Sequence, residues 1–418
     1  MSKHPFVPLR HSQVRRLWFA AVMSDIGTWV QLIVVGVLIA ADTGSALRTG
    51  LVAVATFMPQ GLAAPIGGLL ADRFDKRRVF AGGLVLQATM TGALAAVLAS
   101  GVRTPSVLTV LILLSSVGGS LGQPSYAAML PELVPPEELM AMLSLGIFSW
   151  NGGRVIGPIL ASALAASVGP AGTVAFNALT FLVLAVVVSM VRQEFPPHAD
   201  DPGSIGERLA DGWRTTRSTP ACWLGIVLAV HFSVTVVGFM GLIPIYAKSL
   251  FDGGTGVTGA LASAQGVGAI VGGIVATWLA TRYGRSSLMV GVLVLLPVAL
   301  VAYAMAPTVP FAIGGIALLG FAATPYFIIT SSIIQRDAPA ASRGRVMSIN
   351  QAFSGLSYGC GLIFLGGLAD VTDIRTALVI GGVLMAVGVV VILGRTPNWR
   401  TTVDGTAGVP TEALSATH

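Results

Sequence analysis

The chain has 418 residues, of which 54% are hydrophobic and 10% are charged, and its formal net charge is +6. A typical soluble domain carries about 25% charged residues, so this composition excludes an ordinary soluble globular protein. The two cysteines also exclude a disulfide-based scaffold.

Twelve apolar runs along the chain are each close to the length of about 20 residues that a helix needs to cross a bilayer. Polar and apolar residues do not alternate within these runs as they do in a membrane barrel. We therefore predict an all-α membrane protein with transmembrane helices at 17–40, 49–71, 79–101, 106–130, 139–167, 171–191, 221–247, 257–281, 287–306, 310–334, 345–369 and 375–394.

The first run contains Asp25, the only acidic residue inside any of these predicted helices. At 1.5 Å per residue, Asp25 lies about 12 Å from Leu17, where the run begins. A carboxylate at that depth needs a partner or a water-filled cavity, and such residues commonly mark ion pathways. Asp25 is therefore a candidate proton carrier.

The second run ends in the sequence GLLADRFDKRRVF, which puts six charged residues into positions 72–78. Lys76, Arg77 and Arg78 would hold this loop on the cytoplasmic side, and that alone is a sufficient reason for their presence. Asp72 needs another explanation, because acidic residues contribute little to membrane orientation.

The loop's pattern G-x-L-A-D-R-x-x-K-R-R resembles the signature loop between helices two and three of the major facilitator superfamily. One departure is Asp75, which stands where the superfamily usually has glycine. The resemblance implies the major facilitator fold, with Asp72 near the start of helix eleven. A carboxylate at a helix N-terminus stabilises that end of the helix by about 0.3–1 kcal/mol. The resemblance also implies a cytoplasmic gate formed by Gly68, Asp72, Arg73, Lys76, Arg77 and Arg78. The segments DRFDKRR and ASRGRVMSINQAFSG are similar to the branch that contains enterobactin exporters and related efflux proteins.

The fourth run, VLTVLILLSSVGGSLGQPSYAAML, lacks the arginine that many proton-coupled members of the superfamily carry there. In the fifth run, FSWNGGRVIGPILASAL, Gly153, Gly157 and Pro158 match the end of the superfamily's G-x-x-x-G-P pattern, which is associated with antiporters. Ser144 stands near the position of the pattern's earlier glycine. Small residues spaced by four also permit close helix packing, so this motif is compatible with both packing and function.

Arg154 lies near the middle of the fifth run, where an arginine costs roughly 2.5–3.5 kcal/mol on insertion scales. It therefore needs a partner or an aqueous cavity. Helices one and five are neighbours in the superfamily fold, so we predict that Asp25 and Arg154 face each other or share a cavity in the N-terminal half. Three interpretations stay open: a permanent ion pair, a proton-coupling pair, and an unpaired Asp25.

A charged, proline-containing linker, 192–220, separates the sixth and seventh runs. Within it, Ile205, Leu209 and Trp213 recur at helical spacing, which predicts a short amphipathic helix. We expect this helix to lie on the cytoplasmic membrane surface; the alternative is that it packs against loop ends as a tether.

The second part of the chain repeats the first. The segment after the eighth run matches the charged loop, pairing Ala71 with Ala280, Arg73 with Arg282, and Phe74 with Tyr283. Two pseudo-symmetric six-helix halves commonly hold a substrate site between them near the midplane. We predict an N-terminal half at 1–191, the linker, a C-terminal half at 221–394, and a disordered cytoplasmic tail at 395–418.

Several polar side chains are candidates for the wall of a central cavity: Gln31, Gln123, Tyr126, Asn151, His231 and Gln265. His231 is a second candidate proton carrier, although a neutral histidine bonded inside the helix bundle is the alternative. The scarcity of charge favours an amphipathic or largely apolar substrate over a sugar phosphate or polyanion.

Most of the 24 lysines and arginines fall in segments on the side shared by both termini, and only Arg48, Arg103, Lys248 and Arg375 fall on the other. This bias predicts cytoplasmic termini and a multi-pass protein of the inner (cytoplasmic) membrane.

The sequence lacks a glycine-lysine phosphate loop, which argues against a nucleotide-driven pump. It also lacks a nucleophile–base or metal-ligand cluster, which argues against an intramembrane enzyme. We predict a monomeric secondary transporter that exports an amphipathic or apolar small molecule, such as a drug, siderophore or secondary metabolite, by proton-coupled alternating access. We expect no cofactor, metal or nucleic-acid partner. The alternatives are a proton-coupled uptake symporter and a non-transporting membrane receptor or scaffold.

Overall fold

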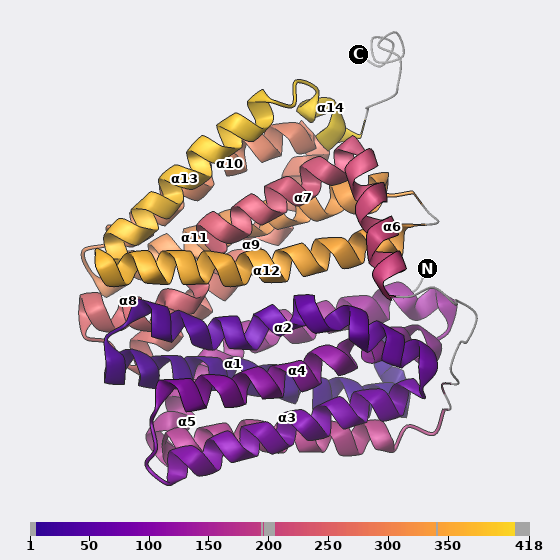
Figure 1. The fold of residues 1–418 in the computed structure, drawn as a ribbon, viewed down its shortest axis with the longest axis vertical. Coiled ribbons are helices and arrows are strands. Elements are labelled where there is room, and N and C mark those ends of the chain that lie inside the picture. The colour runs from indigo at the N-terminus through magenta and orange to yellow at the C-terminus, as the bar shows by residue number, and fades with distance from the viewer. Residues whose placement is uncertain (1–5, 194, 196–204, 340–341, 406–418) are drawn as a thin grey trace.

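The computed structural model describes residues 6–193, 195, 205–339 and 342–405, which form helices and connecting turns without any strand (Figure 1). The N-terminal half begins with the 3-10 helix η1 (Val7–Arg10) and contains α1 (Ser12–Thr43), α2 (Ala46–Arg73), α3 (Lys76–Ala99), α4 (Pro105–Met129), the 3-10 helices η2 (Leu130–Leu133) and η3 (Pro136–Glu138), and α5 (Leu139–Ser189).

The linker helix α6 (Ile205–Ser218) precedes the C-terminal half. That half contains α7 (Pro220–Phe232), the π-helix η4 (Ser233–Val237), α8 (Phe239–Phe251), α9 (Thr255–Tyr283), α10 (Arg285–Ala304), α11 (Val309–Asp337), α12 (Arg343–Val371), α13 (Ile374–Gly394) and the short α14 (Trp399–Asp404).

Within these described ranges, ten helices are individually long and apolar enough to span a membrane, and the bent α2 is an eleventh. One of the ten, Pro136–Ser189, has 54 residues and is interrupted at Gly169, whose φ of 70° and ψ of 177° are not helical. It therefore contains two spans of the usual length. The prediction of twelve transmembrane helices is confirmed.

The two halves lie one above the other in Figure 1, with α2 of the N-terminal half next to α12 of the C-terminal half. Both described chain ends lie on the right in that view, together with α6. We call this side the terminal face and the opposite side the distal face. The connection between α2 and α3 lies at the terminal face, and the connection between α1 and α2 lies at the distal face.

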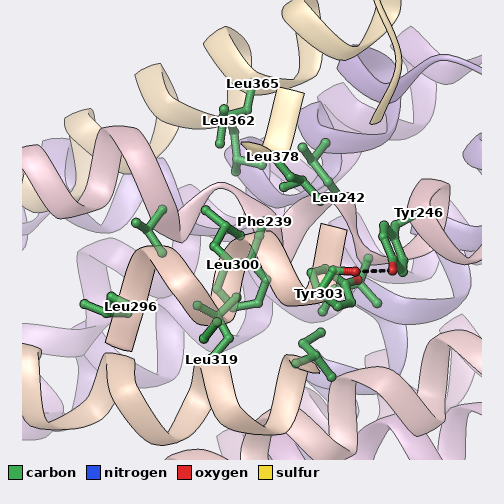
Figure 2. Packing of buried hydrophobic residues seen from close by; sticks show 14 of the residues in the cluster. Phe239, Leu242, Tyr246, Leu296, Leu300, Tyr303, Leu319, Leu362, Leu365 and Leu378 are labelled. Atoms are coloured by element: carbon green, nitrogen blue, oxygen red, sulfur yellow. Dashed lines mark hydrogen bonds between the residues drawn. The ribbon is translucent and has the colours of Figure 1, made fainter. Parts of the chain in front are cut away.

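The outer faces of the bundle are apolar and exposed, as expected for contact with lipid. On α13, for example, Val383, Val387 and Val390 are 53%, 56% and 72% exposed at helical spacing. The interior of the C-terminal half is packed with aliphatic and aromatic side chains (Figure 2). There the Tyr246 hydroxyl donates to the carbonyl of Tyr303 at 2.5 Å, and the two rings stack with centroids 4.1 Å apart.

Acidic residues begin two of the helices. Asp75 accepts a hydrogen bond from the backbone N–H of Arg78 at 3.0 Å and caps the start of α3. Asp373 caps α13 in the same way. N-caps of this type satisfy backbone donors that have no partner inside the helix. The aspartate that departs from the glycine of the superfamily loop therefore has a local structural role.

The linker helix α6 packs against the C-terminal half. Trp213 stacks on Phe353 of α12 with ring centroids 5.5 Å apart and meets Trp223 of α7 edge to face. Asp211 forms an ion pair with Arg345 at 3.0 Å. These contacts correspond to the tether that we considered as the alternative to a helix lying on the membrane. The side chains of Ile205 and Leu209 lie outside the described set.

The prediction of a disordered tail is wrong for α14. The Asp404 carboxylate accepts hydrogen bonds from the backbone N–H and the hydroxyl of Ser286, at 2.8 and 2.6 Å. Arg336 donates to the carbonyl of Val403 at 3.1 Å. These polar contacts tie α14 to α10 and α11, which hydropathy alone does not reveal. Residues 406–418 of the predicted tail lie outside the described ranges.

Candidate functional site: the seam between the halves

The seam between the two halves is closed at the distal face. Asp370, near the end of α12, accepts hydrogen bonds from the Ser45 hydroxyl at 2.6 Å and from the backbone N–H groups of Ala46 and Leu47 at 2.5 and 3.3 Å. The Asp370 carboxylate thus satisfies the N-terminus of α2 across the seam.

Close contacts continue into the middle of the seam. The Ser162 hydroxyl of α5 donates to the carbonyl of Thr255 at 2.9 Å, and Ser263 of α9 donates to the carbonyl of Val155 at 2.9 Å. On the other side of the seam, a Cβ added to Gly61 of α2 would lie 3.2 Å from the Cα of Gly355. Small residues thus let the two halves approach backbone to backbone.

Toward the terminal face, the seam is less closely packed at two glycines. Gly68 of α2 and Gly344 of α12 lie near the terminal ends of the two helices that meet at Gly61. A Cβ at Gly68 or Gly344 would meet no atom within 4 Å. The described halves are therefore in contact from the distal face to about the middle, and the terminal side of the seam is less closely packed.

A cavity of about 20 Å³ lies where the seam closes, large enough for one or two water molecules. Both halves contribute to its wall, which includes Trp29, Phe57, Arg154, Met240, Gln265 and Tyr358. Among the described residues that line it, Arg154 is the only charged one. Of the polar residues that we predicted for the cavity wall, only Gln265 is present there.

The polar atoms around this cavity are incompletely satisfied. Arg154 donates to the Sδ of Met240 at 3.7 Å, and its guanidinium lies 5.9 Å from the centroid of the Trp29 ring. The Nε of Arg154, the Nε1 of Trp29 and the hydroxyl of Tyr358 are buried without a hydrogen-bond partner among the described residues. Buried polar atoms are usually satisfied, so three together indicate a place where water or a ligand binds.

Aromatic side chains form a cluster next to Arg154. The Trp29 ring lies 5.9 Å from Phe57 and 5.5 Å from Trp150, and Phe57 lies 5.6 Å from Tyr358 across the seam. Sequence reasoning missed this cluster, because Trp29, Phe57 and Tyr358 are apolar or weakly polar residues on three separate helices. The one feature of the sequence that could have revealed the cluster is that these residues lie at a depth in the membrane similar to that of Arg154.

We predicted that Asp25 and Arg154 face each other or share a cavity. They form no ion pair, because no described carboxylate lies within 4.0 Å of Arg154, and Asp25 is not among the described residues that line the cavity. Asp25 instead accepts a hydrogen bond from Ser149 of α5. Ser149 and Arg154 are five residues apart, and a helix turns about 140° over that distance. The face of α5 that meets Asp25 is therefore not the face that carries Arg154 into the seam.

The glycines of the helix-five motif bring α1 and α5 together. A Cβ at Gly153 would lie 3.2 Å from the Cβ of Asp25, and one at Gly157 would lie 2.5 Å from the Cβ of Trp29. The carbonyl of Pro158 lies against Gly259 of α9, where an added Cβ would approach it to 2.6 Å. The motif is thus a packing element that positions the neighbours of Arg154.

The other predicted cavity residues lie elsewhere. Gln31 accepts a hydrogen bond from Asn177 at 2.7 Å, Tyr126 stacks on Phe80, and Asn151 donates to the carbonyl of Ile147. Gln123 is exposed on α4. A ring nitrogen of His231 lies 3.2 Å from the carbonyl of Met385, within hydrogen-bond distance. These contacts join helices or stay within one helix, as most polar groups in a bundle do.

The charged loop is tied to the N-terminal half. Lys76 is buried and lies 2.5 Å from the carboxylate of Glu132, and Arg77 donates to the carbonyl of Val191 at 2.7 Å. Arg73 and Arg78 are exposed, and Asp72 is partly buried. Within the described ranges, no group of three His, Cys, Asp or Glu side chains is placed to hold a metal ion.

Comparisons with known proteins agree with this architecture. A family model described as "Transmembrane secretion effector" matches residues 3–415. The multidrug efflux pump Tap of Mycolicibacterium fortuitum is 24% identical over 90% of this chain and 93% of its own length. The enterobactin exporter EntS of Salmonella choleraesuis is 27% identical over 92% of each chain. The macrolide efflux protein A of Streptococcus pyogenes is 20% identical over 88% of this chain and 92% of its own.

Solved structures share the fold. A variant of the nucleoside transporter NupG aligns with a TM-score of 0.75 and 13% identity, over 91% of this chain and 99% of that one. A bacterial homologue of the human lysosomal transporter Spinster, in an inward-facing and occupied conformation, aligns with a TM-score of 0.74 and 14% identity, over 93% and 97%. The chain is a membrane transporter, not an enzyme, and it belongs to the transmembrane secretion effector family of the major facilitator superfamily.

Proposed function

We propose that this protein is a secondary active exporter that moves an amphipathic small molecule across the inner (cytoplasmic) membrane by alternating access. The observation that carries the proposal is the seam, which is closed at the distal face and less closely packed toward the terminal face. The unsatisfied polar atoms lie where the two regions meet. In this proposal the terminal face is cytoplasmic, in agreement with the distribution of lysine and arginine.

Export is favoured over uptake by the relatives, which are a multidrug efflux pump, a macrolide efflux protein and an enterobactin exporter. The protein works as a monomer in this proposal, since each chain supplies both halves of the seam.

Two aspartates control the two ends of the seam in the proposed cycle. Asp370 is the last residue but one of α12 and binds the N-terminus of α2. Asp72 is the last residue but one of α2, and in the opposite conformation it would approach the N-terminus of α12. Each carboxylate would then stabilise one closed end through the positive end of the other helix.

Protons drive the cycle through Asp25. This carboxylate lies away from the helix ends, is partly buried, and has Ser149 as its hydrogen-bond donor. It is close to Arg154 through the α1–α5 contact, although the two do not pair. Proton uptake at Asp25 would change the packing of α1 against α5 and thereby reach the cavity.

The test is transport of amphipathic compounds into inside-out vesicles, with and without a proton gradient, for the wild type and Asp25→Asn. We expect the wild type to accumulate at least one compound only when the gradient is present. The variant should lose accumulation while it still equilibrates the compound. Asp42→Asn is the matched control, because Asp42 is at the distal end of the same helix and lies 3.6 Å from Arg103.

Gradient-dependent accumulation by Asp25→Asn equal to that of the wild type would contradict coupling through Asp25. The absence of gradient-dependent transport of every compound by the wild type would contradict the exporter itself and would favour a receptor or scaffold.

A further inference from the structure

We propose that the transported molecule is an aromatic organic anion, whose negatively charged oxygen atoms bind Arg154 and whose ring packs against the aromatic side chains of the cavity. This inference rests on the proposed export function and names the substrate class for the same site.

The charge of Arg154 has no described counter-charge in the cavity. Among the described residues, Arg154 is the only charged one that lines the cavity, and its described contacts are the sulfur of Met240 and the face of Trp29. Neither contact supplies a negative charge. A buried cation without a counter-ion is unfavourable, so such a residue is retained where something else supplies the charge. An anionic ligand would do so, and a guanidinium binds carboxylate-like groups through two parallel hydrogen bonds.

The polar atoms of the cavity are short of hydrogen-bond acceptors. The unsatisfied Nε of Arg154 and Nε1 of Trp29 can only donate, and the Tyr358 hydroxyl can donate as well. The three groups come from α5, α1 and α12, so they converge on one cavity from both halves. A ligand rich in acceptors satisfies all of them, whereas an ammonium group would add donors where donors are already unsatisfied.

The shape of the wall favours an aromatic ring. Trp29, Phe57 and Tyr358 line the cavity together with Arg154, and Trp150 adjoins Trp29 and Phe57, with centroids of contacting rings 5.5 to 6.4 Å apart. Aromatic rings at these separations favour offset or edge-to-face packing, which an aromatic ligand can extend. The Phe57–Tyr358 contact crosses the seam, so a ring bound there would touch both halves.

The terminal side gives access to the site. The cavity holds only one or two waters in this conformation, so the proposed ligand needs a wider cavity than the one seen here. Trp150 lies about one helical turn from Arg154 on the terminal side, and it is 36% exposed. A ligand can therefore approach from the terminal side along Trp150 and reach Arg154 with its charged end.

The experiment measures binding by calorimetry to the full-length protein in lipid nanodiscs, without any gradient. Three probes share the naphthalene ring system and differ in their head group, which is anionic, neutral or cationic: 2-naphthoate, 2-naphthamide and 2-naphthylmethylammonium. We expect the wild type to bind 2-naphthoate about tenfold more tightly than 2-naphthamide, and the ammonium most weakly. Arg154→Gln should lose the preference for the anion and keep the affinity for the amide.

Two further variants control this result. Arg154→Lys keeps the positive charge and should retain part of the preference for the anion. This variant therefore distinguishes the loss of charge from a loss of folding. Arg103→Gln removes the same charge from the exposed distal surface and should leave all three affinities unchanged. The inference is overturned if the wild type binds the amide or the ammonium as tightly as 2-naphthoate, or does not bind 2-naphthoate at millimolar concentration. It is also overturned if Arg154→Gln leaves the preference intact.

The anion site and the export function can be disproved independently of each other. If 2-naphthoate binds through Arg154 but no compound is transported, the export function is wrong and the anion site stands. If neutral or cationic compounds are exported equally by the wild type and Arg154→Gln, the export function stands and the anion site is wrong.

Discussion

Lys76 shows how a single residue of the charged loop contributes to the fold. Its side chain is 9% exposed, and its ammonium group lies 2.5 Å from the Glu132 carboxylate at the connection between α4 and α5. Arg78, two positions later, is exposed. Although both residues belong to the same motif and carry the same charge, the fold requires only Lys76 to hold two connections together.

Replacement of Lys76 by Met should therefore lower the free energy of unfolding by about 1–2 kcal/mol, because Glu132 is left partly buried without its partner. The partial exposure of Glu132 keeps the value below that of a fully buried pair. The control substitution, Arg78→Met, should change the free energy of unfolding by less than about 0.5 kcal/mol. Denaturant unfolding in mixed micelles measures both; equal effects of the two substitutions would contradict the structural role of Lys76.

At the scale of elements, the contact between α1 and α5 determines where Trp29 and Arg154 lie. Gly157 faces Trp29 so closely that an added Cβ would overlap it at 2.5 Å, whereas a Cβ at Gly152 would meet nothing within 4 Å. These two glycines lie on the same helix and differ in what they face.

Gly157→Ala should destabilise the protein by about 1–3 kcal/mol, because an extra methyl group forces α1 and α5 apart. Gly152→Ala should be neutral or stabilise by up to about 1 kcal/mol, since alanine has the higher helix propensity. Thermal unfolding of the two variants checks this. A Gly157→Ala protein as stable as the Gly152→Ala protein would show that the helices are not in close contact there.

The contact of α12 with α2 at the distal face is a second prediction at this scale. Asp370→Ala removes the acceptor for three donors at the start of α2, so the distal closure should weaken by about 1–2 kcal/mol. Spin labels at Arg103 and Asp252 should then report a larger population with a long distal distance. Asp373→Ala is the control, because Asp373 caps α13 within the C-terminal half. A distance distribution unchanged by Asp370→Ala would contradict the closure.

Sequence patterns were sufficient for the helices but not for the contacts between them. Hydropathy and length predicted all twelve spans, including the two that meet at Gly169, because burial in lipid is a local property of each run. The partner of Asp25 could not be predicted in this way, since it depends on the rotation of α5 about its axis. The distal contact of Asp370 was missed for the same reason: its partners are the Ser45 hydroxyl and two backbone N–H groups, 323 to 325 residues away in sequence.

At the scale of the whole molecule, the proposed mechanism requires the two halves to move against each other as units. The described contacts join the halves at the distal face and in the middle, through Asp370, Ser162 and Gly61. The Lys76–Glu132 ion pair stays within the N-terminal half, and α6 and α14 pack mainly on the C-terminal half. Each half therefore keeps its own internal contacts while the seam changes.

The most direct test of alternating access is a pair of spin-label distances in a chain whose own cysteines are replaced, with Cys222→Ser and Cys360→Ser. Labels at Arg78 and Arg285 report the terminal face, and labels at Arg103 and Asp252 report the distal face; all four positions are exposed. We expect a proton gradient with a transported compound to shorten the terminal distance and lengthen the distal distance in the same fraction of molecules. Distances that stay constant, or that lengthen together, would contradict alternating access.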